Sequence, residues 1–420
     1  MEQAEERHSP VGIEPRIVYV LGAVVDEVPQ YDRRQDAFAS SEGISVLCGS
    51  ARHMLPKLWS AGLEPKPGRK PSLVLHPPEG RTMGPLRVTV PLANTMFTNG
   101  KTHSLSASRW ETRPGQSPRF VDRIEKVNQT ILFKTDDTGS SHDCASTVAC
   151  NLVPITKPRR IVSGLGNILR QIDIDGPAPA STELETNIPG ILDARARKVV
   201  ESTSQAEDTY SGPVGIWALI MPPRYIEEGM PMAEPLNWQD YHAKSETLLA
   251  GETNGRLDLV LAAGGRICKV LSGGGGWGQK KGLLSLDPQT SHDSPEEDDL
   301  ESFIDSFKGD GGIAAPGSYV QFFMEAVGPA RTDRTSAGLR RWDPADATAA
   351  PYPTIVAGTP GLGIPASPPA AGTSPNLFGA ISSEGIYLSS EGDHDKDRTP
   401  IATKIDSPRS HIVSSGSAMP

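Results

Sequence analysis

The chain has 420 residues, a formal net charge of -10 and 5% aromatic residues, and 42 glycines and 38 prolines interrupt its apolar segments. The acidic charge disfavours sequence-independent binding to nucleic acid, which depends on neutralising phosphates. No apolar run approaches the roughly 18 residues that cross a membrane. Four cysteines in so long a chain are typical of reduced thiols inside the cell. We expect an intracellular protein, cytoplasmic by default with an organelle left open, that binds neither nucleic acid nor membrane.

The first third of the chain predicts mainly strands. Residues 1–12 are polar and lack the apolar stretch of a signal peptide, so we expect a flexible terminus there. Residues 16–25 and 43–48 are short and rich in β-branched side chains, as buried strands are. Apolar residues at helical spacing predict a short helix at 52–62. Further strands are expected at 73–75, 86–92, 101–110 (after an Asn-Gly turn), 130–134 and 150–155.

The middle of the chain predicts helices around one strongly apolar strand. Helices are expected at 190–201 and 236–250, and the apolar run 214–221 predicts a central strand. Two apolar runs flanking Ala263-Gly264-Gly265 predict a β-hairpin over 256–271. The proline-rich stretch 176–180 indicates a linker, with a possible subdomain boundary near 176–185.

The last part of the chain predicts one helix, one strand and a tail. Ser294-Pro295-Glu296-Glu297 has the pattern of a helix start, and residues 318–327 predict the last strand. Beyond residue 328 the chain is rich in Pro, Ala, Gly and Ser and loses periodicity. The predicted fold class is therefore α+β: a mixed, sheet-centred globular domain with long irregular loops over residues 13–328, and a disordered tail over 329–420.

A glycine-rich segment at 272–282 is the most informative local feature. Successive glycine amides can hold an anion, and lysines would add charge. The segment contains Gly-x-Gly-x-x-Gly, but it lacks the long helix that a Rossmann unit requires and the Lys-Ser or Lys-Thr of a P-loop. Two interpretations stay open, a loop packed under other backbone and a site for a phosphate-bearing small molecule. The residues of that site would be Gly273, Gly274, Gly275, Gly276, Trp277, Gly278, Lys280 and Lys281.

The helix predicted after Ser294 has an apolar stripe at i, i+3, i+4 and i+7 spacing. Such a stripe packs on its own domain in most proteins, and it can also fill the groove of a protein partner. The residues of this candidate partner site are Leu300, Phe303, Ile304 and Phe307.

We identify no motif for metal binding or catalysis in this sequence. His142, Asp143, Cys144 and Cys150 lack the short pair spacing of zinc sites, so we expect no metal and no cofactor. The Gly-x-Ser-x-Gly elbow and the protein-kinase motifs are absent from the sequence. The first hypothesis is a non-enzymatic binding or scaffold protein of unknown partner. The alternative is an enzyme or ligand-binding domain that holds a phosphate-bearing small molecule at 272–282.

Two short stretches carry a resemblance. Residues 271–288 and 87–100 resemble uncharacterised proteins of filamentous fungi. This resemblance implies no fold, activity or functional residue.

Overall fold

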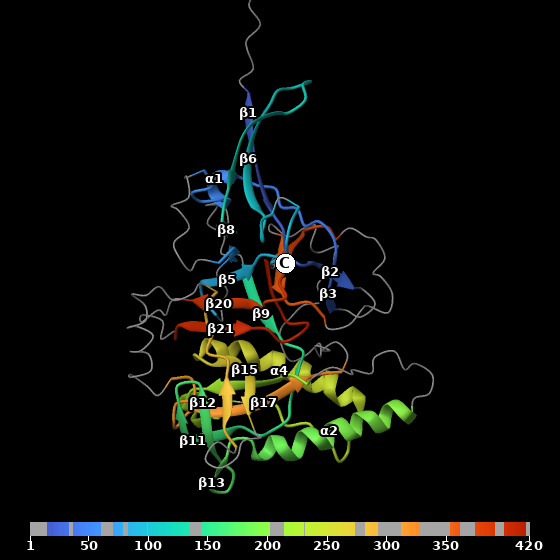
Figure 1. The fold of residues 1–420 in the computed structure, drawn as a ribbon, viewed down its shortest axis with the longest axis vertical. Coiled ribbons are helices and arrows are strands. Elements are labelled where there is room, and N and C mark those ends of the chain that lie inside the picture. Colours follow the sequence, from blue (N-terminus) through green and yellow to red (C-terminus); the bar gives the residue numbers. More distant parts are fainter. Residues whose placement is uncertain are drawn as a thin grey trace, which may run out of the picture.

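The fold was taken from a computed structural model of the full chain (Figure 1). It describes residues 15–32, 37–59, 70–78, 83–98, 100–133, 144–201, 214–230, 232–273, 282–292, 312–327, 353–361, 374–390 and 399–416. The expected flexible terminus at 1–12 lies outside these residues.

A first hydrophobic core receives buried side chains from two sheets in the middle of Figure 1. In β5 the burial alternates, with Leu86, Val88 and Val90 inside and Arg87 exposed, as in a strand with one buried face. The five-stranded sheet has the order β21 (Ile401–Ile405), β20 (Ile386–Ser390), β5 (Leu86–Pro91), β4 (Ser72–His76) and β8 (Asn128–Leu132). The four-stranded sheet has the order β19 (Leu377–Ile381), β18 (Thr354–Gly358), β22 (His411–Gly416) and β9 (Cys144–Ala149).

A second core belongs to a sheet that closes on itself, because β14 pairs with both β15 and β17. Two long helices, α2 (Thr182–Glu201) and α4 (Ala243–Ala262), lie beside this sheet at the bottom of Figure 1. The sheet has the order β10 (Leu152–Pro154), β17 (Tyr319–Glu325), β11 (Arg159–Leu165), β12 (Ile168–Asp173), β16 (Leu284–Leu286), β15 (Arg266–Gly273) and β14 (Ile216–Met221), with β13 (Pro177–Pro179) paired to β12.

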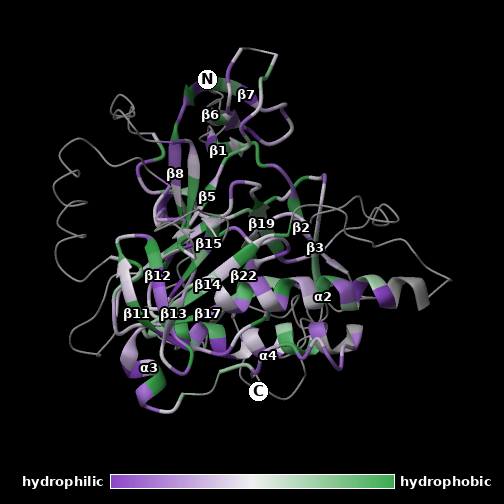
Figure 2. Cartoon of the chain, turned by 60° about the horizontal axis from the view of Figure 1, so that its bottom comes forward, coloured by the Kyte–Doolittle hydropathy of each residue, from purple (hydrophilic) through white to green (hydrophobic). Residues whose placement is uncertain are grey.

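Strand β14 lies between the two cores. Trp217, Leu219 and Met221 face the first core, and Ala218 and Ile220 face the second. Both faces are therefore buried, which explains why this segment is so apolar and appears as a green strand inside the molecule in Figure 2. The central strand predicted at 214–221 is confirmed.

Three smaller pieces complete the described fold. A sheet of β1, β6 and β7 projects from one end of the molecule (Figure 1); we call it the arm. The remaining elements are the hairpin β2 (Val28–Asp32) and β3 (Ala37–Ser41), and the short helices α1 (Ala51–Met54) and α3 (Pro223–Glu227). The arm strands are β1 (Arg16–Ala23), β6 (Leu105–Thr112) and β7 (Arg119–Glu125).

The α+β, sheet-centred fold class is confirmed, but the predicted tail at 329–420 is wrong for the residues that the structure describes there. Strands β18 to β22 belong to the first core, to which they contribute Ile355, Leu388 and Ile412. Each of them is short, and they pair with β5 and β9, which lie far away in the sequence. These strands join the core by pairing with distant strands, and the sequence pattern within the tail does not show that pairing.

The predicted hairpin at 256–271 is also wrong, because residues 256–262 belong to helix α4. Its buried residues fall at helical spacing, from Ala250 through Asn254 and Leu257 to Leu261. The strand expected at 43–48 is irregular, and the helix expected at 52–62 is limited to α1.

Residue 176 does not separate two cores. The second core combines side chains from before it, such as Ile161 and Leu169, with side chains from after it, such as Ile191 and Phe322. The first core does the same, with Leu75 before and Leu219 after. Strand β13, which begins at 177, is hydrogen-bonded to β12.

Candidate interaction surface

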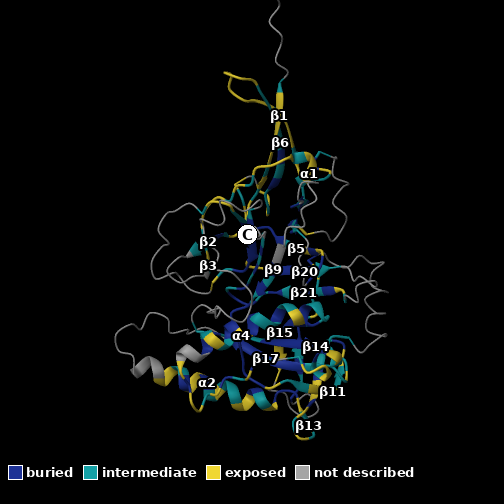
Figure 3. Cartoon of the chain, turned by 180° about the vertical axis from the view of Figure 1, so that it is seen from behind, coloured by how far each residue is buried: buried dark blue, intermediate teal, exposed yellow. Residues whose placement is uncertain are grey.

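The arm exposes most of its side chains beyond its base. Strand β1 pairs antiparallel with β6, and β6 pairs antiparallel with β7. Leu105 and Ala107, at the base of β6, are fully buried. Further out, five consecutive residues of β1 from Arg16 are exposed, as the yellow end of this strand shows in Figure 3. The prediction of a buried strand at 16–25 is therefore wrong in burial, although a strand forms there.

One face of the arm carries a cluster of apolar side chains, which we call the arm face: Val18, Val20, Trp110 and Phe120. Register places Val18 opposite Trp110, and Trp110 opposite Phe120. The two aromatic rings meet edge to face, with centroids 5.3 Å apart. The Trp110 Nε1–H donates to Ser108 Oγ at 2.9 Å, so this indole is already satisfied within the arm. Val18, Val20 and Phe120 are 38%, 49% and 52% exposed.

A bulge in β7 creates this cluster. Asp122 lies opposite Arg109, whereas Phe120 lies opposite Trp110, so the register skips Val121. Side chains alternate across a strand, so a regular ladder would have placed Phe120 on the face of Asp122. The extra residue instead brings Phe120 beside Trp110. Bulges that redirect a side chain in this way are typical features of functional edges.

The opposite face of the arm is partly covered by Trp59. Tyr19 packs against this indole with ring centroids 6.0 Å apart, and the Arg109 guanidinium carbon lies 5.3 Å from its centroid. Trp59 thus contacts two side chains of that face, with a cation–π contact of the kind that contributes about 0.5–1 kcal/mol at exposed sites, while Tyr19 stays 39% exposed.

The predicted glycine-loop site lies largely outside the described residues, which end at Gly273 and resume at 282. Gly273 pairs with Leu284 across β15 and β16, and a Cβ there would lie 2.7 Å from the Leu283 carbonyl oxygen and 2.3 Å from Leu284 Cδ2. Glycine is thus required at this position for close strand pairing. Gly274, Gly275, Gly276, Trp277, Gly278, Lys280 and Lys281 lie outside the described residues, as do Leu300, Phe303, Ile304 and Phe307 of the predicted partner helix.

Two of the described cysteines, Cys150 and Cys268, are buried and inert, whereas Cys48 is an exposed free thiol. Burial raises the pKa of Cys150 to about 12 and that of Cys268 to about 12. The thiolate is the nucleophile and the metal ligand, so neither side chain is reactive at neutral pH. No group of three or more His, Cys, Asp or Glu side chains within the described ranges is arranged to hold a metal ion.

A buried carboxyl links helix α4 to β9. Asp258 accepts a hydrogen bond from the Val148 amide at 2.8 Å, and Asn254, one turn earlier, accepts one from the Cys150 amide at 2.7 Å. Burial raises the pKa of Asp258 to about 7. A pKa near neutrality often marks an active site. Here both side chains bond backbone groups of the same strand, which indicates that they anchor it to the helix.

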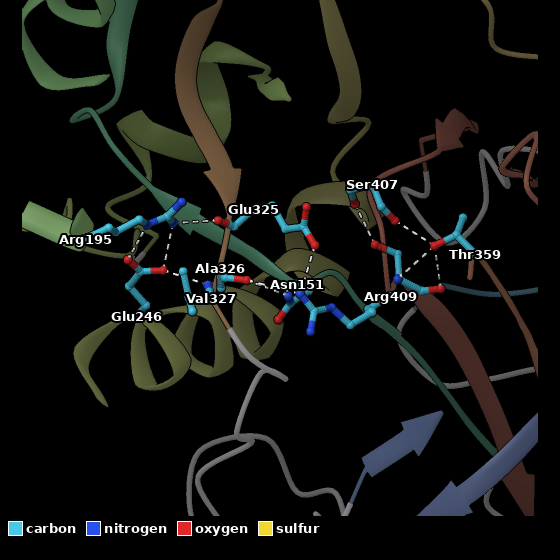
Figure 4. A network of polar contacts seen from close by, with 10 residues as sticks. Asn151, Arg195, Glu246, Glu325, Ala326, Val327, Thr359, Ser407 and Arg409 are labelled. Carbon is cyan, nitrogen blue, oxygen red and sulfur yellow. Dashed lines mark hydrogen bonds and ion pairs between the residues drawn. The ribbon is translucent and has the colours of Figure 1, made fainter. Parts of the chain in front are cut away.

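A buried ion pair joins α2, α4 and β17, as Figure 4 shows. Glu246 is fully buried and accepts two bonds from Arg195, at 2.9 and 2.8 Å, one from the Tyr241 hydroxyl at 2.7 Å and one from the Val327 amide at 2.8 Å. Its oxygens are thus supplied with donors inside the protein, as a buried charge requires. The network also includes Glu325, whose carboxylate accepts a bond from Arg409 at 2.9 Å. This cluster stabilises the packing of three elements.

A small cavity between α4, β14 and β17 does not provide a substrate site. Its lining includes Thr253, Arg256 and Gln321, and its free space is about that of one water molecule. Gln321 is fully buried, and its Nε2 donates to the Thr156 and Ala233 carbonyl oxygens at 2.9 and 3.0 Å. Substrate pockets are far larger, on the order of 300 Å³ or more.

Comparison with known proteins found no similar protein. No protein-family model matches the chain, no curated protein matches it, and no solved structure matches it. Among the described residues, none of the helices is long and apolar enough to cross a membrane.

Sequence reasoning missed the arm face for an identifiable reason. Its β1 residues belong to a continuous apolar run, which is the pattern of a buried strand, and Trp110 was expected only at the end of a strand. The four charged residues among the seven of β7 were a usable signal of an exposed strand. The pairing of Phe120 with Trp110 depends on the bulge, which local sequence does not reveal.

Proposed function

We propose that this chain is a non-enzymatic binding or scaffold protein, and that its protein partner docks on the arm face. The observation that carries the proposal is the cluster of Val18, Val20, Trp110 and Phe120 at one end of the molecule, in which Trp110 is half-buried and the other three side chains are exposed. Aromatic residues surrounded by smaller apolar ones are the usual anchors of protein interfaces. The formal charge of -10 favours a protein partner over nucleic acid.

Rigidity supports this assignment. The Trp110 ring is fixed by its hydrogen bond to Ser108 and by its contact with Phe120, so little side-chain freedom is lost on docking. The base of the arm is anchored in the first core by Leu105. The arm therefore presents a preorganised surface.

The experiment is affinity capture with the full chain and two matched variants. Phe120→Ser removes the exposed ring, and Leu165→Ser changes an apolar strand residue that is 71% exposed on β11, away from the arm. Truncation of an aromatic anchor costs about 2 kcal/mol or more, or roughly thirtyfold in affinity. We expect a protein captured in stoichiometric amount by the wild type and by Leu165→Ser, and lost with Phe120→Ser.

Two results would contradict this function. One is equal capture by both variants at matched melting temperature, because the arm face would then make no contact. The other is loss of the same protein with Leu165→Ser alone, because the surface would then lie on the closed sheet.

A further inference from the structure

The two edge strands of the arm, β1 and β7, differ in whether another strand can pair with them. Strand β1 pairs only with β6 among the described strands, and residues 17–23 contain neither charge nor proline. The other edge, β7, carries Arg119, Asp122, Arg123 and Glu125 within seven residues and is bulged. Charges and bulges on an edge prevent the addition of another strand. Residues 17–23 of β1 have neither protection.

The register identifies which backbone groups of β1 point outward. The Val24 amide donates to the Ser104 carbonyl oxygen at 3.0 Å, and this pair continues the β1–β6 register by one step. In an antiparallel ladder, hydrogen-bonded pairs alternate with pairs that are not hydrogen-bonded. The backbone groups of Val18 and Val20 therefore bond to β6. Those of Ile17, Tyr19 and Leu21 point to the free edge.

The outward groups lie at the centre of a nearly symmetric sequence. Residues 17–21 read Ile-Val-Tyr-Val-Leu, which is the same in residue class in both directions about Tyr19. We propose that β1 pairs antiparallel with β1 of a second copy of this chain, across a two-fold axis at Tyr19. The inference goes beyond the proposed function, because its occupant is a second copy and its bonds come from the edge of β1.

In this pairing every group meets a suitable partner. Tyr19 lies opposite Tyr19 of the second copy, and Ile17 lies opposite Leu21; these are the hydrogen-bonded pairs, and each exchanges two backbone bonds. Val18 lies opposite Val20, so β-branched side chains pack across the join. The charged end of the strand, Arg16, lies opposite Gly22, so no like charges oppose each other. Such an interface is self-complementary and closed, as in most homodimers.

The test is the mass of the full chain by light scattering after size-exclusion chromatography. We expect the wild type to have a mass of twice 44.8 kDa, that of a dimer. The variant Val18→Lys with Val20→Lys brings lysines opposite lysines at the join, and we expect a monomer. The matched variant Val18→Glu with Val20→Lys places opposite charges there, and we expect a dimer. Both positions are exposed, so either double variant is expected to fold.

Backbone hydrogen exchange supplies a second readout. The amides of Ile17, Tyr19 and Leu21 are expected to be protected in the wild type and to exchange rapidly in the double-lysine variant, while those of β4 stay equally protected in both. A monomeric wild type, a dimeric double-lysine variant, a monomeric Glu/Lys variant or unprotected wild-type amides would each overturn the proposal. Phe120→Ser is expected to stay dimeric while it loses the partner, so failure of one proposal is distinguishable from failure of the other.

Discussion

The buried carboxyl of Asp258 predicts a pH-dependent stability that one isosteric change removes. Burial raises its pKa from 3.8 to about 7 in the folded protein. Below pH ~4 the group is protonated in both states, and its effect on stability is nil. Between pH ~4 and ~7 the unfolded chain releases the proton and the folded protein retains it, so stability falls as pH rises. Above pH ~7 the loss is complete.

The magnitude follows from the shift. A rise from 3.8 to about 7 corresponds to about 4 kcal/mol, at about 1.36 kcal/mol for each pKa unit. Asp258→Asn resembles the protonated acid, and its Oδ1 can still accept the bond from the Val148 amide. We expect the variant to match the wild type near pH 4 and to be more stable by up to about 4 kcal/mol at pH ~8.

The assay is urea unfolding of both proteins at a series of pH values, followed by circular dichroism. The difference between the two free energies of unfolding is the informative quantity, because His411 contributes an opposite trend. Burial lowers the pKa of His411 to about 4, so its contribution is present above pH ~6.5 and is lost as pH falls towards 4. In the wild type the effects of Asp258 and His411 on stability oppose each other, whereas the Asp258→Asn variant keeps only the effect of His411. A difference that is independent of pH, or that grows towards low pH, would refute the reasoning.

Two further substitutions test the packing. Glu246→Gln leaves Arg195 buried beside a neutral group, so unfolding by urea is expected to show a loss of about 3–5 kcal/mol; an unchanged midpoint would show that the ion pair does not hold the helices together. Gly164→Ala places a Cβ 2.2 Å from the Ala314 carbonyl oxygen, and a loss of about 1–3 kcal/mol is expected. Gly22→Ala, where no atom lies within 4 Å of the new Cβ, is the control. Equal melting temperatures for the two alanine variants would contradict the clash.

Strands with strong local patterns were predictable from the sequence. The alternation of Leu86, Val88 and Val90 predicted β5, and the uniformly apolar run around Trp217 predicted β14, because burial imposes these patterns directly. Helix α4 was predictable only in its first part, which overlaps the helix expected at 236–250, because alternating apolar residues around Asp258 imitate a strand within its last two turns. Asn254 and Asp258, the polar residues that face inward there, bond to β9, a contact between distant segments.

The candidate site was less predictable than the fold. The residues 17–21 have the composition of a core strand, and whether a second layer covers them is decided by distant parts of the chain. The strands that begin at Thr354 and Ile386 failed prediction for a related reason. Their apolar stretches are too short to be recognised as strands on their own, and they form strands by pairing with β22 and β5.

Photo-crosslinking from position 120 tests the central claim, that the arm face binds a protein partner. A photoreactive phenylalanine analogue replaces Phe120 in one full-length protein and Leu165 in a second, and both are illuminated in living cells. The account predicts a covalent adduct with another protein from position 120 and none from position 165. An adduct from position 165 alone, or no adduct from position 120 while the wild type still captures its partner, would contradict it.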